Sequence, residues 1–179
     1  MSHPMTLSQI VAIARGDEPA DLVLTNARLI DVLSGRIDLT EIAIAGPLVV
    51  GVGGAYRGRE AVDLEGRYVC PGFIDAHVHL ESALVRPREY ARAVVPRGVT
   101  TVITNPHEIA NVLGIEGIRF MLEDTERAAM DDFVMVPSCV PATPMATSGA
   151  SLALAALQPR LSERRVSGLG GGMAVPGVV

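Results

Sequence analysis

Residues 71–82 of the chain read Pro-Gly-Phe-Ile-Asp-Ala-His-Val-His-Leu-Glu-Ser and carry two of its four histidines two positions apart. Because side chains alternate between the faces of a β-strand, this run predicts that Asp75, His77 and His79 share one face, opposite the apolar side chains between them. Two imidazoles on a rigid strand can bind one metal ion: zinc, iron, nickel or copper, or manganese in a mixed nitrogen and oxygen site. The alternative is a half-buried strand whose histidines are only hydrogen-bonded.

The residues around this strand predict where its chemistry lies. Pro71 and Gly72 mark its start, and Glu81 and Ser82 follow its C-terminal end, where barrels and open α/β sheets place their functional groups. Beyond it, β-branched runs alternate with helical periodicities, which predicts a parallel sheet with right-handed connections. We predict helices over 87–95, 109–128 and 151–161, the last capped by Ser151, and strands over 98–104, 133–136 and 166–169.

The segment before this strand has a different pattern. Residues 6–15 have apolar side chains at helical spacing, with Thr6 or Ser8 as the cap. Short β-rich runs separated by glycine and proline turns follow. The predicted strands are 22–25, 28–31, 41–45 and 49–52. We therefore expect a helical extension over 1–20 and a small β-domain over 21–70.

Composition limits the class of protein and of ligand. The chain has 179 residues, a hydrophobic content of 49% and a mean hydropathy of +0.34, which is enough for a sizeable core. Fifteen basic against twenty acidic residues give a net charge of −5 without a run of arginines. This balance argues against nucleic acid or an anionic membrane as a partner and favours a small neutral or polar substrate.

The sequence shows neither a signal peptide nor a membrane-spanning segment. Residues 1–20 lack the apolar core of a signal peptide, and no uninterrupted apolar segment reaches the length of a membrane span. We therefore expect a cytoplasmic protein. Cys70 and Cys139 are too few for a disulfide framework, and their apolar contexts predict two buried thiols.

The run over 71–82 resembles the signature of the amidohydrolase superfamily, which comprises metal-dependent hydrolases on a TIM-type barrel. The resemblance implies that this strand is the first of the barrel, that His77 and His79 are both metal ligands, and that the preceding β-domain is part of a β-sandwich. Residues 71–179 hold four βα units, whereas a (β/α)8 barrel needs eight strands and about 250 residues. We therefore predict the N-terminal half of a barrel, whose unpaired edges favour recruitment of another chain or self-association into a homo-oligomer.

Further segments resemble the adenine deaminase family within that superfamily. They are residues 99–114, 133–144, 147–150 and 166–179. The resemblance implies hydrolytic deamination of a purine substrate, in which adenine and water give hypoxanthine and ammonia. It also implies a divalent cation, manganese first, with iron or zinc as alternatives, which lowers the pKa of water to about 7 and so supplies hydroxide.

Two positions depart from that family's pattern. Asn105 stands where an Asp commonly precedes Pro-His-Glu, and Gly171 stands where the family has a Glu that bridges two metals. The family's remaining ligands would lie beyond Val179. We identify no catalytic residue in this chain, and we predict that it lacks turnover by itself. The alternatives are a truncated, catalytically inactive amidohydrolase and a deaminase of another cyclic amidine or amide.

Four residues after the first two predicted barrel strands are candidates for contact with substrate or for support of the metal ligands. They are Glu81, Asn105, His107 and Glu108. For Glu81 the alternative is a solvated loop carboxylate. For Glu108 the alternative is capping of the following helix, beside the positive end of the helix dipole.

Overall fold

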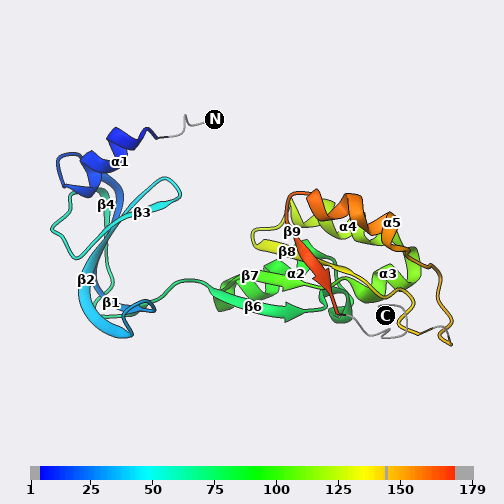
Figure 1. Ribbon diagram of the computed structural model, residues 1–179. Helices are drawn as coiled ribbons and strands as arrows, with labels where there is room; N and C mark the ends of the chain where they lie inside the picture. Colours follow the sequence, from blue (N-terminus) through cyan, green and yellow to red (C-terminus); the bar gives the residue numbers. More distant parts are fainter. Residues whose placement is uncertain (1–4, 144, 172–179) are drawn as a thin grey trace. The chain divides into compact units, whose positions relative to one another are not determined.

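The computed structural model of the chain describes residues 5–143 and 145–171 (Figure 1). The chain divides into two compact units, Met1–Pro71 and Gly72–Val179. The last part of the segment that resembles a fourth strand and its exit, residues 172–179, lies outside the described residues. Within the described part of the chain, no helix is long and apolar enough to cross a membrane.

The first unit begins with helix α1 (Leu7–Ala14). The Thr6 hydroxyl accepts a hydrogen bond from the Gln9 backbone N–H, and the Gln9 side chain accepts one from the Thr6 N–H, so Thr6 rather than Ser8 caps the helix. The helix packs Ile13 against a sheet of strand order β3-β2-β1-β4, in which β5 also pairs with β1. The strands are β1 (Ala20–Asp31), β2 (Arg36–Ala45), β3 (Leu48–Val52), β4 (Gly58–Asp63) and β5 (Tyr68–Val69).

Strand β1 differs from its prediction. The sequence predicts separate strands over 22–25 and 28–31, but the structure has one continuous strand. A register shift between Leu24 and Ala27, where Asn26 has a φ of 53°, forms a bulge that interrupts the alternation without ending the pairing with β2. Strand β4 is not among the predicted strands, because its sequence Gly-Arg-Glu-Ala-Val-Asp lacks an apolar run and none of its residues is buried.

An apolar hollow of about 440 Å³ remains in the first unit, lined by side chains of β1, β2 and β3 such as Leu29, Ile44 and Val49. A sheet normally buries its apolar face against another element. The partial β-sandwich implied by the sequence would leave a surface of this kind, and it stays a prediction.

The second unit is a parallel sheet of strand order β6-β7-β8-β9, with helical segments between successive strands (Figure 1). Its strands are β6 (Phe73–Val78), β7 (Val99–Thr104), β8 (Asp131–Pro137) and β9 (Val166–Gly170). Its helical segments are η1 (Leu80–Ala83), α2 (Pro87–Val94), η2 (Val95–Arg97), α3 (His107–Leu113), α4 (Ile115–Thr125), α5 (Leu154–Leu157) and η3 (Gln158–Ser162). This order confirms the predicted α/β class with a parallel sheet.

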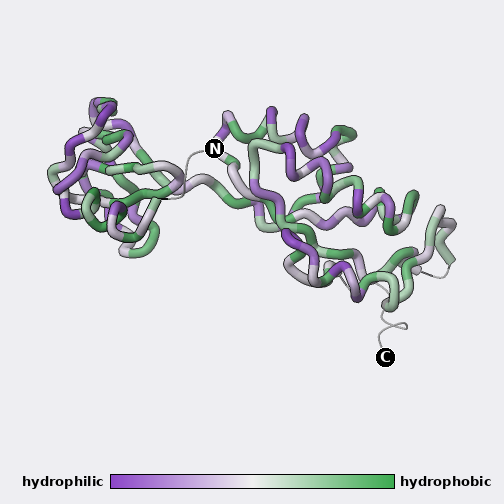
Figure 2. Tube along the Cα trace, turned by 90° about the horizontal axis from the view of Figure 1, so that it is seen from above, coloured by the Kyte–Doolittle hydropathy of each residue, from purple (hydrophilic) through white to green (hydrophobic). Residues whose placement is uncertain are grey.

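Two apolar clusters hold the helices on one face of this sheet. Val102 of β7 packs with Ala91 of α2 and Met121 of α4, and Val134 of β8 packs with Ile118 of α4. Hydrophilic and hydrophobic stretches alternate along the helices of this unit (Figure 2), as expected for helices with one buried face. The other face of the sheet has no helix among the described residues.

Asp124, near the end of α4, ties that helix to the start of α2. Its buried carboxylate accepts a hydrogen bond from the Arg88 backbone N–H at 3.1 Å and forms ion pairs with the side chains of Arg86 and Arg88. Burial acts to raise the pKa of Asp124, but the hydrogen bonds from Arg86 and Arg88 outweigh it and hold the pKa below its ordinary value. The contact also caps α2, whose N-cap residue Arg86 provides no side-chain cap.

Two predicted helices have different boundaries in the structure. The single helix predicted over 109–128 is two helices, because Gly114 has a φ of 60° and a ψ of −136°, a conformation that only glycine adopts readily. The helix predicted over 151–161 begins only at α5 and passes into the turn η3, where Pro159 cannot donate a backbone hydrogen bond. Ser151 is therefore not its cap.

Strand β6 contains a bulge that changes the predicted orientation of Asp75. Asp75 pairs with Val102 and Val78 pairs with Thr104, so β6 has one residue more than β7 between these pairs. Val102 is buried under the helices, so Asp75 lies on the helix-facing side, where burial and the Asp75 charge raise the pKa of Tyr90. The prediction that Asp75 shares a face with the histidines is therefore wrong.

The two cysteines lie in different environments. Cys139 is buried, as predicted. The prediction for Cys70 is wrong, because this residue is exposed just after the two-residue strand β5 and outside any core cluster of the described residues.

Asp132 is a buried charge on the helix-facing side of β8. The residue is fully buried, and neither carboxylate oxygen has a hydrogen-bond partner. Burial raises the pKa of Asp132 to about 7 from an ordinary value of 3.8, even though the Arg165 charge opposes the shift. Between these two values the folded protein binds a proton that the unfolded chain has lost. The free energy of unfolding therefore falls as the pH rises from about 4 to about 7.

We expect Asp132→Asn to raise the free energy of unfolding by about 1–3 kcal/mol near pH 8, and much less near pH 4, because the amide cannot ionise. Urea unfolding followed by circular dichroism at both pH values measures the difference. Asp131→Asn is the matched control, since this exposed neighbour pairs with Arg165 at 3.3 Å and should gain no stability when its charge is removed. An equal effect of Asp132→Asn at both pH values would contradict the raised pKa.

Candidate metal centre

The end of β6 presents the two predicted metal ligands side by side. The strand ends at Val78, and His79 follows as the N-cap of η1. The ring centroids of His77 and His79 lie 5.2 Å apart, with the ring planes inclined by 72°. His77 is exposed and His79 is partly buried. Two imidazoles in this arrangement can approach one cation from a single short segment of backbone.

Glu108 orients the His79 ring. Nδ1 of His79 lies 2.7 Å from Oε2 of Glu108, and the Ser82 hydroxyl donates to Oε1 of the same carboxylate at 3.1 Å. Because an ionised carboxylate only accepts hydrogen bonds, the proton of neutral His79 is assigned to Nδ1, and the lone pair of Nε2 stays available to a cation. A carboxylate on the far nitrogen of a histidine ligand is the usual support of a metal site.

Glu81 fixes the helix that carries Glu108. Oε1 of Glu81 accepts hydrogen bonds from the backbone N–H groups of Glu108 at 3.1 Å and Ile109 at 3.4 Å, in the first turn of α3. The N-cap residue of α3, Pro106, provides no side-chain cap. The capping carboxylate is thus Glu81 and not Glu108. Glu81 is not a freely solvated loop residue either, since its Oε2 is buried and has no hydrogen-bond partner.

The environments of the two carboxylates shift their pKa values in opposite directions. Burial raises the pKa of Glu81, and the neighbouring Glu108 charge adds to the rise. Burial also acts to raise the pKa of Glu108, but the hydrogen bond from His79 leads the contributions that bring it below its ordinary value. Paired carboxyl groups with opposed shifts are typical of functional sites.

The donor atoms at this position fit a divalent cation. His79, Glu81 and Glu108 each offer a ligand atom, and these atoms lie within 4.8 Å of one another. Imidazole nitrogen with carboxylate oxygen suits manganese, iron or zinc, and the unpartnered Oε2 of Glu81 is an oxygen that a cation would satisfy. A cation held by Nε2 of His79 beside His77 keeps the Glu108 hydrogen bond, whereas one at Nδ1 would break it. The first arrangement therefore costs fewer contacts.

His107 is buried between α3 and the loop after β8. Its Nε2 donates to the backbone carbonyl of Cys139 at 2.7 Å, and its Nδ1 lies 3.2 Å from the side-chain amide of Asn111. Burial lowers the pKa of His107, so the ring is neutral at neutral pH. Both nitrogens are already hydrogen-bonded, so neither is free for a cation, and contact with substrate stays a prediction.

Asn105 lies at the end of β7 and reaches across to β9. The residue is buried, and its side-chain oxygen has no hydrogen-bond partner. A Cβ on Gly170 would approach the Asn105 amide to 2.8 Å, so glycine at this position makes room for that side chain. The next residue differs, because a Cβ on Gly171 would meet no atom of residues 5–143 and 145–171 within 4 Å. This part of the fold therefore does not itself require glycine at position 171.

Two residues that support the site are not among the predicted ones. Ser82 donates to Glu108, and Asn111 contacts the His107 ring. Asn111 lies four residues after His107, which places both on one face of a helix, and this spacing is a signal that could have found it. Nothing in the sequence around Ser82 distinguishes its hydroxyl from that of an ordinary loop serine.

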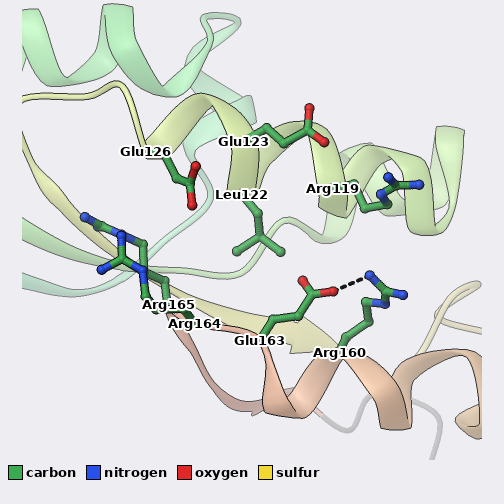
Figure 3. Close-up of a pocket in the computed structure, with 8 residues that line it drawn as sticks. All are labelled: Arg119, Leu122, Glu123, Glu126, Arg160, Glu163, Arg164 and Arg165. Atoms are coloured by element: carbon green, nitrogen blue, oxygen red, sulfur yellow. Dashed lines mark hydrogen bonds and ion pairs between the residues drawn. The ribbon is translucent and has the colours of Figure 1, made fainter.

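A charged hollow of about 350 Å³ lies elsewhere in the second unit (Figure 3). Its lining comes from α4, from η3 and from the segment that leads into β9, and comprises Arg119, Leu122, Glu123, Glu126, Arg160, Glu163, Arg164 and Arg165. Arg160 and Glu163 form an ion pair with each other on one side of it, opposite α4 (Figure 3). The hollow lies at the start of β9, whereas parallel βα sheets carry their chemistry at the C-terminal ends of strands. We therefore place the candidate site after β6.

The sequence matches known proteins along most of its length. Residues 68–170 match the model of the Amidohydrolase family. The adenine deaminase of Cereibacter sphaeroides is 50% identical over 174 residues, and adenine deaminase 1 of Rhizobium meliloti is 48% identical over 173 residues. Each alignment covers 97% of this chain but 31% of the relative. The chain thus spans about a third of the length of these relatives.

Solved structures share the fold at lower identity. The N-acyl-D-glutamate deacylase of Bordetella bronchiseptica, solved with zinc and a phosphonate inhibitor, has a TM-score of 0.62 at 22% identity over 90% of this chain and 40% of its own. The D-hydantoinase of a Thermus species has a TM-score of 0.52 at 24% identity, over 65% of this chain and 27% of its own. The described elements therefore correspond to part of the fold of these enzymes.

We expect His79→Ala to abolish binding of manganese or zinc, and Glu108→Gln to weaken it about tenfold or more, because the amide holds the His79 ring less firmly. Isothermal titration with each metal measures both effects. Glu116→Gln is the matched control, since this exposed carboxylate on α4 pairs with Arg119 and has no contact with the histidines. Unchanged affinity in Glu108→Gln would show that Glu108 does not support a metal ligand.

Proposed function

This chain belongs to the amidohydrolase family, and on that premise we propose that it provides the first-strand metal ligands of a deaminase that converts adenine and water to hypoxanthine and ammonia. The observation that carries the proposal is the His79–Glu108 pair beside His77, at the C-terminal end of β6. The choice of adenine is supported by the relatives, which are named adenine deaminases and are 48–50% identical to this chain.

His77 and His79 are the residues that would hold the cation. Glu108 keeps the proton of His79 on Nδ1, so that Nε2 faces the cation, and Ser82 holds the Glu108 carboxylate in place. Glu81 keeps the first turn of α3 next to η1 and so sets the distance between Glu108 and His79. These roles need only hydrogen bonds that the structure already contains.

A divalent cation at this site supplies the Lewis acidity that generates hydroxide from water near neutral pH. We propose manganese, with iron or zinc as alternatives, because the resemblance to the adenine deaminase family implies manganese first and imidazole nitrogen suits iron and zinc. In the overall reaction, the amino group at C6 of adenine leaves as ammonia and the oxygen of water takes its place. We assign the proton transfer that accompanies this exchange to no residue of this chain. Glu81 and Asn105 stay candidates for contact with the purine.

A second candidate is a non-catalytic amidohydrolase fragment, and Gly171 is the observation that favours it. A bridging carboxylate would come from this position in the adenine deaminase family, and glycine offers none. Deamination or hydrolysis of another cyclic amidine or amide is a third candidate. The structural relatives named a deacylase and a hydantoinase support the fold alone, so they do not favour it over adenine.

The proposed partner is a small purine, not nucleic acid or a membrane. The net charge of −5 argues against a polyanion as the partner. We also propose a cytoplasmic protein, because two cysteines are too few for a disulfide framework and so suit a reducing compartment.

We expect no ammonia release from adenine by this chain alone when manganese, iron or zinc is supplied, and Gly171→Glu by itself should not restore it. We expect turnover when the Gly171→Glu chain is combined with the remaining segment of the Cereibacter sphaeroides relative as a separate polypeptide, because the other ligands are then present. An enzyme-coupled ammonia assay measures each combination.

The matched control for that experiment is the same combination carrying His79→Ala, which should stay inactive. Turnover by the unmodified chain that a chelator abolishes would contradict the prediction that it is incomplete. An active His79→Ala combination would contradict the metal role of His79.

A further inference from the structure

The charged hollow between α4 and η3 contains arginine N–H groups that lack an acceptor (Figure 3). Nε of Arg160, and both Nε and Nη1 of Arg165, are buried and have no hydrogen-bond partner among residues 5–143 and 145–171. A guanidinium group donates hydrogen bonds and accepts none, and a charged group that is buried without a partner costs free energy. These two side chains therefore favour a ligand that brings acceptor oxygens.

Each of these arginines is already held in place through another of its nitrogens. Nη1 of Arg160 pairs with the Glu163 carboxylate, and Nη2 of Arg165 lies 3.3 Å from Oδ1 of Asp131. Because the protein itself orders both side chains, a ligand would lose less free energy to ordering them when it binds. The hollow is thus preorganised for an acceptor.

Arg165 has a backbone conformation that suits glycine better than arginine. Its φ is 73° just before β9, and its carbonyl accepts a hydrogen bond from the Val134 N–H of β8 at 2.7 Å. Glycine would adopt this conformation without strain but would bring no side chain to the hollow. Strained residues of this kind concentrate at ligand sites. The strain at Arg165 therefore agrees with a binding role for its guanidinium group.

Carboxylates share the hollow with the arginines. Glu123 and Glu126 are exposed and form no ion pair with any described residue. Figure 3 shows Glu126 on the side of α4, across from Arg164 and Arg165. Leu122 is the one apolar side chain among the eight described lining residues, which include four arginines and three glutamates. The lining thus offers donors and acceptors in nearly balanced number.

The walls of the hollow belong to two connections between described strands. Helix α4 lies between β7 and β8, and η3 lies between β8 and β9, and only residue 144 of these connections is outside the described residues. Strand β9 begins next to the hollow at Val166 and leads away from it to Gly170. The arginines and glutamates of the hollow are therefore placed by the chain between β7 and β9, and not by the residues that follow β9.

We propose that this hollow binds a small zwitterion of the α-amino acid type. Its carboxylate accepts hydrogen bonds from Arg160 and Arg165, and its ammonium group donates to Glu126. Hydrogen bonds between a guanidinium and a carboxylate are among the strongest in proteins, because both partners are charged. A simple anion would leave the glutamates without a donor, and a simple cation would leave the arginines without an acceptor. The single apolar contact, Leu122, suits a ligand with a small side chain.

This site is separate from the candidate metal centre. It lies at the start of β9, whereas His77 and His79 lie at the C-terminal end of β6 in the same parallel sheet. The bound zwitterion is thus a ligand of the fold and not the substrate of the proposed deaminase. Because it bridges α4 and the segment before β9, it stabilises the folded chain by mass action.

Isothermal titration of the purified 179-residue chain with L-alanine tests the proposal. We expect L-alanine to bind and to raise the unfolding temperature as its concentration rises. Propionate lacks the ammonium group and ethylamine lacks the carboxylate, and each should bind about tenfold more weakly or less. No binding of L-alanine would overturn the proposal. Propionate or inorganic phosphate that binds as tightly as L-alanine would overturn the zwitterion.

Variants of the lining assign the two ends of the ligand. Arg165→Gly and Arg160→Gln should each weaken L-alanine binding about tenfold or more. Arg165→Gly should stay folded because glycine suits a φ of 73°, and circular dichroism checks this in both variants. Arg127→Gln is the matched control, since this exposed arginine follows Glu126 without lining the hollow and its loss should change nothing.

Glu126→Gln should weaken the binding of L-alanine but not that of propionate, because only L-alanine has an ammonium group to donate. Undiminished L-alanine binding in both arginine variants would overturn the site. An equal loss of L-alanine and propionate binding in Glu126→Gln would overturn the contact between Glu126 and the ammonium group.

Discussion

The candidate site depends on one extra residue in β6. Asp75 lies on the side of the sheet that faces α2, and strict alternation from there would carry His77 and His79 to the same side. The bulge changes this order, so that Val78 and Leu80 belong to the helix-facing core, while His77 is exposed and His79 is partly buried. The Asp75 carboxylate accepts the His77 backbone N–H at 3.2 Å within this bulge. The broken register thus keeps the two candidate ligands out of the helix-facing core.

Two carboxylates link the start of η1 to the start of α3, and each element contributes one of them. Glu81 of η1 accepts hydrogen bonds from the backbone of α3, and Glu108 of α3 accepts them from His79 and Ser82. Since Pro106 leaves α3 without a cap of its own, Glu81 both satisfies the helix end and places Glu108. One contact therefore serves stability and ligand orientation together, and loss of either carboxylate would disturb both elements.

The sequence was enough to predict the α/β order, the first-strand histidine pair and the polar residues around it. It was not enough for features that depend on pairing between distant segments. The bulges at Asp75 and Asn26 arise from register with a neighbouring strand, which alternation along one strand does not reveal. Whether Glu81 or Glu108 caps α3 depends on a contact across 27 residues. The break at Gly114 was open to prediction, because glycine within a helical pattern lowers the expectation that the helix continues.

The first-strand ligands and the rest of the barrel depend on different kinds of interaction. The histidine support is local, since every hydrogen bond that holds His79 runs among residues of β6, η1 and the first turn of α3. These hydrogen bonds therefore do not depend on the residues that follow β9. Closure of the sheet is not local, because it requires strands that pair with the free edges of β6 and β9. A chain of this length can thus keep the geometry of its metal donors while its enclosed pocket depends on other strands. At Gly171, the described part of the fold leaves room for a Cβ, but the sequence provides no side chain there.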